Sequence, residues 1–187
     1  MKIALVTACL AGVCILGAAG AVATPSITQT AIAGAKLGLP ASAYKQLLGP
    51  PVTTARGTHA DPIHPDDYSR LVFHKRKLSV YFVDGEDKGV LITTWNRRYK
   101  TAAGIGPCST IRRAKAVYGK RLKPSKFNSQ HGVVYAYTLR KNLIFASNNL
   151  FRIEVVGLYD GSDPNVSKRG GSLAYAGFIT LNETPCF

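Results

Sequence analysis

Two short segments of the chain place apolar residues at helical spacing. In the second segment, Ser109 or Thr110 supplies an oxygen for the N-terminal N–H groups, and Gly119 supplies a left-handed residue at the C-terminus. The apolar residues between these ends form one stripe: Ile111, Ala114, Val117 and Tyr118. The cations fall outside that stripe: Arg112, Arg113 and Lys115. The pattern predicts a short helix with one buried side and a basic outer side.

The same pattern occurs 70 residues earlier, where a helix is predicted over residues 41–48. Gly34 aligns with Gly104, and Gly49 aligns with Gly119, without a gap. The aligned apolar residues of this earlier helix are Tyr44, Leu47 and Leu48. Self-similarity at one long period indicates a tandem of two supersecondary units, at about residues 32–100 and 101–181.

Strand-like segments follow each predicted helix. They cover residues 70–74, 78–83, 90–95, 133–139, 143–147, 151–159 and 172–181. In the second of these, Leu78, Val80 and Phe82 alternate with Ser79 and Tyr81, a pattern typical of a sheet covered on one face. Two cationic tips close hairpins at residues 75–77 and 140–142, and loops are expected at residues 53–67 and 120–130. About seven strands and two short helices predict an antiparallel α+β fold.

The first 23 residues have the pattern of a signal peptide. Lys2 precedes an apolar run, and Ala21-Val22-Ala23 is a small-x-small cleavage site. We therefore expect a secreted protein, Thr24–Phe187, that forms a single domain without a transmembrane segment.

Two cysteines remain after that cleavage, Cys108 and Cys186. In an exported protein an even pair predicts a disulfide. The alternative is a nucleophilic Cys108, because a helix N-terminus and nearby Arg112 favour a thiolate. His131 would be the base, in the Cys-then-His order of NlpC/P60-type cell-wall peptidases, although Pro107 stands where that family usually has an acidic residue.

The charge of the chain is one-sided. Its 24 Lys and Arg residues and 10 acidic residues give a net charge of +14. Between Asp87 and Glu154 there is no carboxylate, whereas cations recur throughout that span. A surface field of one sign attracts polyanions and weakens with salt. The alternative is a surface whose charge only keeps the protein solvated.

Residues 95–100 interleave aromatic rings with cations, the composition of a surface that stacks on rings and binds phosphates. The alternative is an ordinary strand end with snorkelling cations. Together with the basic helix, this segment defines the candidate binding patch. The candidate residues are Trp95, Arg97, Arg98, Tyr99, Lys100, Arg112, Arg113, Lys115, Lys120, Arg121, Lys123 and Lys126.

Metal and cofactor motifs do not stand out. His59, Asp61 and His64 fall in a Pro-containing loop, and no HExxH pattern occurs. The acidic turn at residues 84–87 lacks the ligand order of a calcium loop, and no glycine-rich phosphate-binding motif is present. We expect neither a metal nor a cofactor.

Short motifs carry a resemblance to a known family. They are Gly38-Leu39, Leu47-Leu48-Gly49-Pro50, Ser109-Thr110 and Val117-Tyr118-Gly119. With the helix-then-meander order, the chain resembles β-lactamase-inhibitory proteins and the small outer-membrane lipoproteins of the SmpA type, over residues 32–181. The resemblance implies a tandem fold whose sheet forms a concave protein-binding face. This chain departs from it by its basic charge, its distant cysteine pair and its lack of the inhibitor's contact loops, so β-lactamase inhibition does not carry over.

These patterns favour a secreted, non-catalytic binding module. The expected partner is an anionic cell-envelope polymer, an acidic lipid surface or an acidic protein, and no dedicated nucleic-acid motif is present. The alternatives are the peptidase that uses Cys108 and His131, and a purely structural envelope protein.

Overall fold

One antiparallel sheet of eight strands carries the fold. The computed structural model describes residues 26–56, 68–83, 87–129, 132–140, 142–160 and 186. The strands lie in the order β3-β4-β5-β6-β10-β9-β8-β7, and a separate two-stranded sheet pairs β1 with β2. The sheet strands are β3 (Thr53–Arg56), β4 (Tyr68–Phe73), β5 (Leu78–Val83), β6 (Gly89–Thr94), β7 (Leu122–Ser129), β8 (Gly132–Leu139), β9 (Leu143–Ser147) and β10 (Val155–Tyr159).

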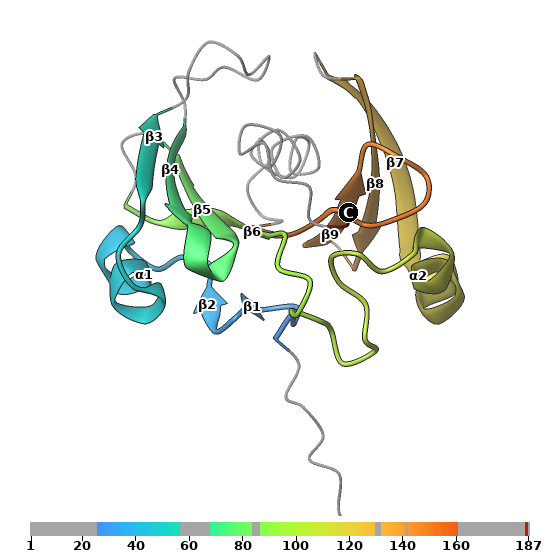
Figure 1. Ribbon diagram of the computed structural model, residues 1–187, viewed down its shortest axis with the longest axis horizontal. Helices are drawn as coiled ribbons and strands as arrows, with labels where there is room; N and C mark the ends of the chain where they lie inside the picture. Colours follow the sequence, from blue (N-terminus) through green and yellow to red (C-terminus); the bar gives the residue numbers. More distant parts are fainter. Residues whose placement is uncertain are drawn as a thin grey trace, which may run out of the picture.

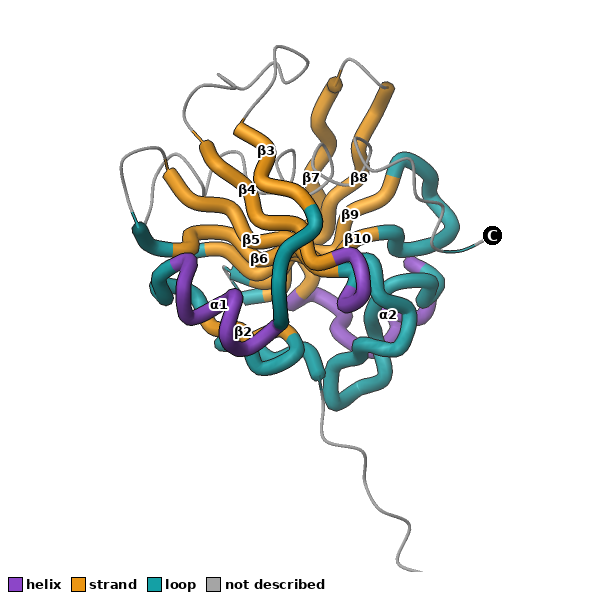
Figure 2. Tube along the Cα trace, turned by 60° about the vertical axis from the view of Figure 1, so that its left-hand side comes forward, coloured by secondary structure: helices purple, strands orange, loops and turns teal. Residues whose placement is uncertain are grey.

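The remaining elements are short: β1 (Ala31–Ile32), β2 (Ala35–Lys36), α1 (Ala41–Leu48), α2 (Ile111–Tyr118) and the 3₁₀ turns η2 (His74–Arg76) and η3 (Gly119–Arg121). The sheet is bent so that its two edges rise on the same side, and α1 and α2 lie against its outer face (Figure 1). Figure 2 shows the strands fanning out above the helices. The α+β class predicted from the sequence is confirmed.

Both helices have the predicted bounds. The Thr110 side chain caps α2 by accepting from the N–H of Arg113 at 3.2 Å, and Gly119 has a φ of 53° at the opposite end. Pro40 offers no side-chain cap to α1, and the carboxylate of Asp87 instead accepts from the N–H of Ala41 at 3.1 Å. The apolar stripe is wrong at Val117, which is 38 % exposed, and at the aligned Leu47 of α1, which is 45 % exposed.

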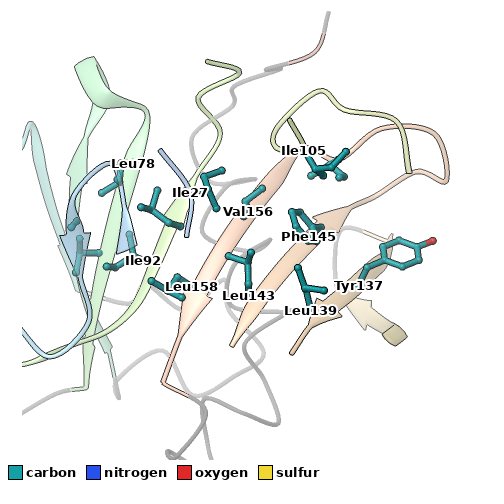
Figure 3. Packing of buried hydrophobic residues seen from close by; sticks show 14 of the residues in the cluster. Ile27, Leu78, Ile92, Ile105, Tyr137, Leu139, Leu143, Phe145, Val156 and Leu158 are labelled. Carbon is teal, nitrogen blue, oxygen red and sulfur yellow. The ribbon is translucent and has the colours of Figure 1, made fainter. Parts of the chain in front are cut away.

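Four apolar residues of the helices are buried against the outer face of the sheet. Tyr44 and Leu48 of α1, and Ile111 and Ala114 of α2, belong to one cluster that we call the helix-face core. Sheet residues complete it, among them Leu78, Ile92, Leu139, Leu143, Phe145, Val156 and Leu158 (Figure 3). Burial of each large side chain stabilises the fold by about 1.5–3 kcal/mol.

The opposite face of the sheet is buried as well. We call its cluster the inner-face core: Val72, Tyr81, Val90, Leu91, Trp95, Val134, Ala136, Ile144, Ala146, Val155 and Tyr159. Ser79 and Tyr81, expected on an open face of β5, are both buried. The prediction of a sheet covered on one face is therefore wrong, because alternation in a strand does not reveal what covers its polar side.

Two segments predicted as loops are edge strands. Thr53–Arg56 forms β3 and Leu122–Ser129 forms β7, at the two ends of the strand order. Pro124 and the cations around it favoured a loop. An edge strand nevertheless tolerates both, because one side of its backbone has no strand to pair with.

The other strand predictions hold more closely. β5 and β9 have the predicted bounds, and β4, β6 and β8 begin and end within about two residues of them, the scatter normal for such boundaries. β10 begins at Val155 instead of Phe151, because Asn149 holds residues 149–152 in a turn. The predicted strand over residues 172–181 lies outside the described residues.

Candidate functional site

Exposed cations are concentrated on α2, η3 and β7. All seven candidate cations there are exposed: Arg112, Arg113, Lys115, Lys120, Arg121, Lys123 and Lys126. Glu154, which ends the carboxylate-free span, is 6 % exposed and accepts from the Asn148 N–H at 2.8 Å and the Ser147 hydroxyl at 3.2 Å. Its carboxylate is thus engaged by hydrogen bonds inside the protein.

The pleat of β7 separates two of these cations. Lys123 lies opposite Thr138 and Lys126 lies opposite Tyr135. Because the two lysines are an odd number of residues apart, their side chains leave opposite faces of the sheet. Tyr135 packs against the helix-face core, which places Lys126 on the side of α2 and Lys123 on the inner side.

Lys115 connects the basic side of α2 to the sheet. Its Nζ lies 5.2 Å from the centre of the Tyr137 ring on β8, within cation–π range. We define the α2 surface as Arg112, Arg113, Lys115 and Lys126. It combines outward cations with tyrosine rings of β8, the strand next to the edge of the sheet.

Lys100 connects residues 95–100 to the start of α2. Its ammonium donates to the carbonyl of Pro107, just before the helix. Burial, and secondarily the charge of Arg113, lower the pKa of Lys100. Lys100 thus holds two segments of the basic region together from a partly buried position.

The aromatic part of the predicted patch is corrected by the structure. Trp95 is 1 % exposed and belongs to the inner-face core, so it offers no surface for stacking. Tyr99 is half-buried against the helix-face core. Arg97 and Arg98 are exposed in the turn after β6, where the side chain of Asn96 accepts from the Arg98 N–H at 3.0 Å. Of residues 95–100, only Arg97 and Arg98 are thus exposed.

The sequence reasoning missed an apolar pair beside α2. Leu150 is exposed, and Phe151 is 77 % exposed. Their loop is held firmly, because the Asn149 side chain accepts from the N–H groups of Phe151 and Arg152 at 2.9 and 3.0 Å. The Phe151 carbonyl also accepts from the Ile111 N–H at 3.0 Å, which docks the loop on the first turn of α2. Asn148-Asn149 is a turn signal that could have revealed this loop in the sequence.

The predicted disulfide is confirmed. Cys108 and Cys186 are bonded, with their Cα atoms 5.2 Å apart and 78 residues between them in sequence. The Cys108 backbone has a φ of 68°, in the left-handed region. A bonded sulfur carries no thiolate for nucleophilic attack. His131, the other residue of the peptidase alternative, lies outside the described residues.

Most of the candidate metal ligands lie outside the residues that the structure describes. His59, Asp61, His64 and the acids at positions 84 and 86 lie outside the described residues, and Asp87 caps α1. Within the described ranges, His, Cys, Asp and Glu residues form no cluster of three or more that could hold a metal ion.

Comparisons with protein-family models, with curated proteins and with solved structures found no match to this chain. In the part of the chain that the structure describes, neither helix has the length and apolar character needed to cross a membrane.

Proposed function

We propose that this protein is a secreted, non-catalytic binding module that holds an anionic partner on its α2 surface. The observation that carries the proposal is the exposure of Arg112, Arg113, Lys115 and Lys126 with no carboxylate in the sequence between Asp87 and the buried Glu154. Such a surface attracts anionic polymers, acidic lipids and acidic proteins. Export depends on the signal peptide proposed over residues 1–23, with cleavage near Ala23.

Compared with an anionic polymer, an acidic protein is favoured by the Leu150–Phe151 pair. Protein interfaces are enriched in exposed aromatic side chains and arginines, and a rigid aromatic anchor loses little conformational freedom on binding. Phe151 is exposed on a loop fixed to the start of α2, next to Arg112 and Arg152. An acidic protein can complement both the ring and the charge, whereas an anionic polymer complements the charge alone.

We also propose that the chain is a tandem repeat of one helix-plus-four-strands unit, as the resemblance to β-lactamase-inhibitory proteins and SmpA-type lipoproteins implies. The element order supports this, because α1 precedes β3 to β6 and α2 precedes β7 to β10. Two backbone pairings also correspond. Gly38 and Leu39 exchange hydrogen bonds with Gly89, and Cys108 and Ser109 exchange them with Ile153.

The proposed binding surface differs from the one that this resemblance implies. In that family a concave sheet face binds a protein. In this chain Ser79 and Tyr81, which the alternation of β5 places on the polar face, are 0 % and 6 % exposed. We therefore assign binding to the outer, α2 side.

Salt-dependent retention on a sulfated polysaccharide resin tests the charge. The variant Arg112→Glu/Arg113→Glu/Lys115→Glu should lose most of its retention. The control Lys36→Glu/Lys75→Glu/Arg76→Glu changes the net charge equally at exposed positions of β2 and the β4–β5 turn, and it should keep most of its retention. Equal loss in both variants would favour the alternative of a structural envelope protein whose charge only solvates it.

A second variant tests the aromatic anchor. Phe151→Ala should leave retention on the polysaccharide unchanged, because the polymer offers no apolar pocket. A protein bound by the wild type but by neither Phe151→Ala nor the triple-Glu variant is the expected acidic partner. A partner that binds Phe151→Ala as tightly as wild type would contradict the role of the ring.

A further inference from the structure

A pocket opens at the C-terminal end of α2, away from the Cys108 end of that helix. Its volume is about 380 Å³, within the usual range for small-ligand sites. Four segments that are distant in sequence line it: residues 27–29, residues 101–103, the end of α2 with η3, and the β8–β9 turn. Such convergence gives an open hollow with room for one small molecule, in contrast to the outward-facing α2 surface.

The base of the pocket is apolar. Ile27, Leu139 and Leu143 line it and are themselves buried in the helix-face core. Val117 lines the pocket as well, and this accounts for its exposure on a helix whose other predicted apolar residues are buried or half-buried. These side chains suit a ligand with a hydrocarbon body.

Two arginines border the same space, Arg121 of η3 and Arg140 of the β8–β9 turn. None of the described residues that line the pocket is acidic. The Arg121 guanidinium is held by the carbonyl of Tyr118 at 3.3 Å and lies 5.9 Å from the Tyr118 ring centre. Because guanidinium groups bind carboxylates and phosphates in a fixed geometry, each of these arginines suits an anionic group.

The pocket is held in shape before any ligand binds. The Tyr118 hydroxyl lies 2.8 Å from the Thr101 hydroxyl, and its ring stacks on Phe145 at 5.9 Å between centres. On the facing side, the Asn142 amide donates to the Gln29 carbonyl at 2.7 Å, which ties the β8–β9 turn to the N-terminal segment. A preformed site loses less conformational entropy when a ligand enters.

We infer that this pocket binds a small organic anion, a carboxylate or phosphate attached to an apolar body. The anionic group pairs with Arg121 and Arg140, and the apolar body packs on Ile27, Val117 and Leu143. This site is additional to the proposed binding of a macromolecular partner on the α2 surface.

Titration of the disulfide-bonded protein with octanoate, octyl phosphate and neutral 1-octanol tests the inference, by calorimetry and methyl NMR. Both anions should bind at least tenfold more tightly than octanol and should shift the methyl signals of Ile27, Val117 and Leu143. Competition of octyl phosphate with phosphatidylglycerol vesicles identifies a lipid headgroup as the natural source, and lack of competition identifies a free anion.

Two variants of equal net charge make the test specific. Arg121→Gln/Arg140→Gln should weaken both anions at least tenfold and leave octanol unchanged. Lys75→Gln/Arg76→Gln, at the exposed β4–β5 turn, should bind both anions as the wild type does. Equal anion binding by both variants, or NMR shifts spread over the surface without the three methyl groups, would overturn the inference. The result is independent of the α2 surface, because neither variant changes Arg112, Arg113, Lys115 or Lys126.

Discussion

Thr93 of β6 and Gly157 of β10 lie directly opposite each other at the centre of the eight-stranded sheet. One row of cross-strand partners continues from this pair to both edges, through Ser79, Val72 and Thr53 on one side and Ile144, Thr138 and Lys123 on the other. The sheet bends at this centre (Figure 1). Small residues at the middle of the row suit the concave side of a bend, where side chains have the least room.

The pair Tyr44 and Gly89 makes the first stability prediction. A Cβ added at Gly89 would lie 2.8 Å from two carbons of the Tyr44 ring, which is fully buried. Gly89→Ala should therefore lower the free energy of unfolding by about 1–3 kcal/mol. Urea unfolding measures this change. The double variant Gly89→Ala/Tyr44→Leu should lose less unfolding free energy than the two single variants lose together. A loss equal to that sum would show that the two residues do not collide.

Alkaline unfolding should depend on Tyr44. Burial raises the pKa of Tyr44 to about 12 in the folded protein, above the value of 10.0 for an exposed tyrosine. Above pH 10 the unfolded chain therefore loses this proton more readily than the folded protein. Stability falls as the pH rises from 10 to 12, by at most about 3 kcal/mol from this group.

Tyr44→Phe provides the matched measurement. It should be about 1 kcal/mol less stable than wild type at pH 8, because it loses the hydrogen bond from the Tyr44 hydroxyl to the Lys36 carbonyl. Its unfolding free energy should fall less steeply from pH 10 to 12 than that of the wild type. Parallel pH profiles for the two proteins would contradict the assignment.

The disulfide makes two predictions that can be separated. Cys108→Ala/Cys186→Ala should lower the unfolding free energy by about 4 kcal/mol, because the bond closes a long loop in the unfolded chain. Cys108→Gly/Cys186→Ala should be about 0.5–1 kcal/mol more stable than this alanine variant. The reason is that residue 108 has a φ of 68°, which glycine adopts without strain. Thermal unfolding of the two variants compares them, and an alanine variant at least as stable as the glycine variant would refute the strain argument.

Each helix should be destabilised by the loss of its cap, but the capping residue lies next to α2 and far in sequence from α1. Thr110→Ala removes the side-chain acceptor for the Arg113 N–H and should cost about 1 kcal/mol, whereas Thr110→Ser should keep most of that stability. For α1 the corresponding change is Asp87→Ala, because Asp87 caps the helix from 46 residues away. Urea unfolding of the three variants tests this, and a neutral Asp87→Ala would show that α1 needs no such partner.

Local signals predicted the helices well. Thr110 and Gly119 lie next to the helix that they end, so the sequence contains the whole signal. The cap from Asp87 to Ala41 joins distant positions, and no local pattern indicates it. The disulfide was predictable because only two cysteines, Cys108 and Cys186, follow the expected cleavage site of an exported chain.

Features that depend on tertiary neighbours were not predictable. Pro124 resembled a loop residue in the sequence. Its place in an edge strand is set by the order of all eight strands, which no local pattern indicates. Trp95 resembled a stacking residue because cations follow it in the sequence. Its burial depends on distant residues of the inner-face core. The Arg121–Arg140 pocket is lined by segments that meet only in the folded chain.

The composition of β7 also bears on how concentrated solutions of this protein behave. A free sheet edge can recruit the edge of another molecule and begin a fibril. Here that strand has Pro124, which offers no N–H, between Lys123 and Lys126, and two such edges would bring like charges together. The opposite edge, β3, has only four residues. Edge-to-edge assembly is thus disfavoured at both ends of the sheet, and the features of β7 that resembled a loop in the sequence act against aggregation.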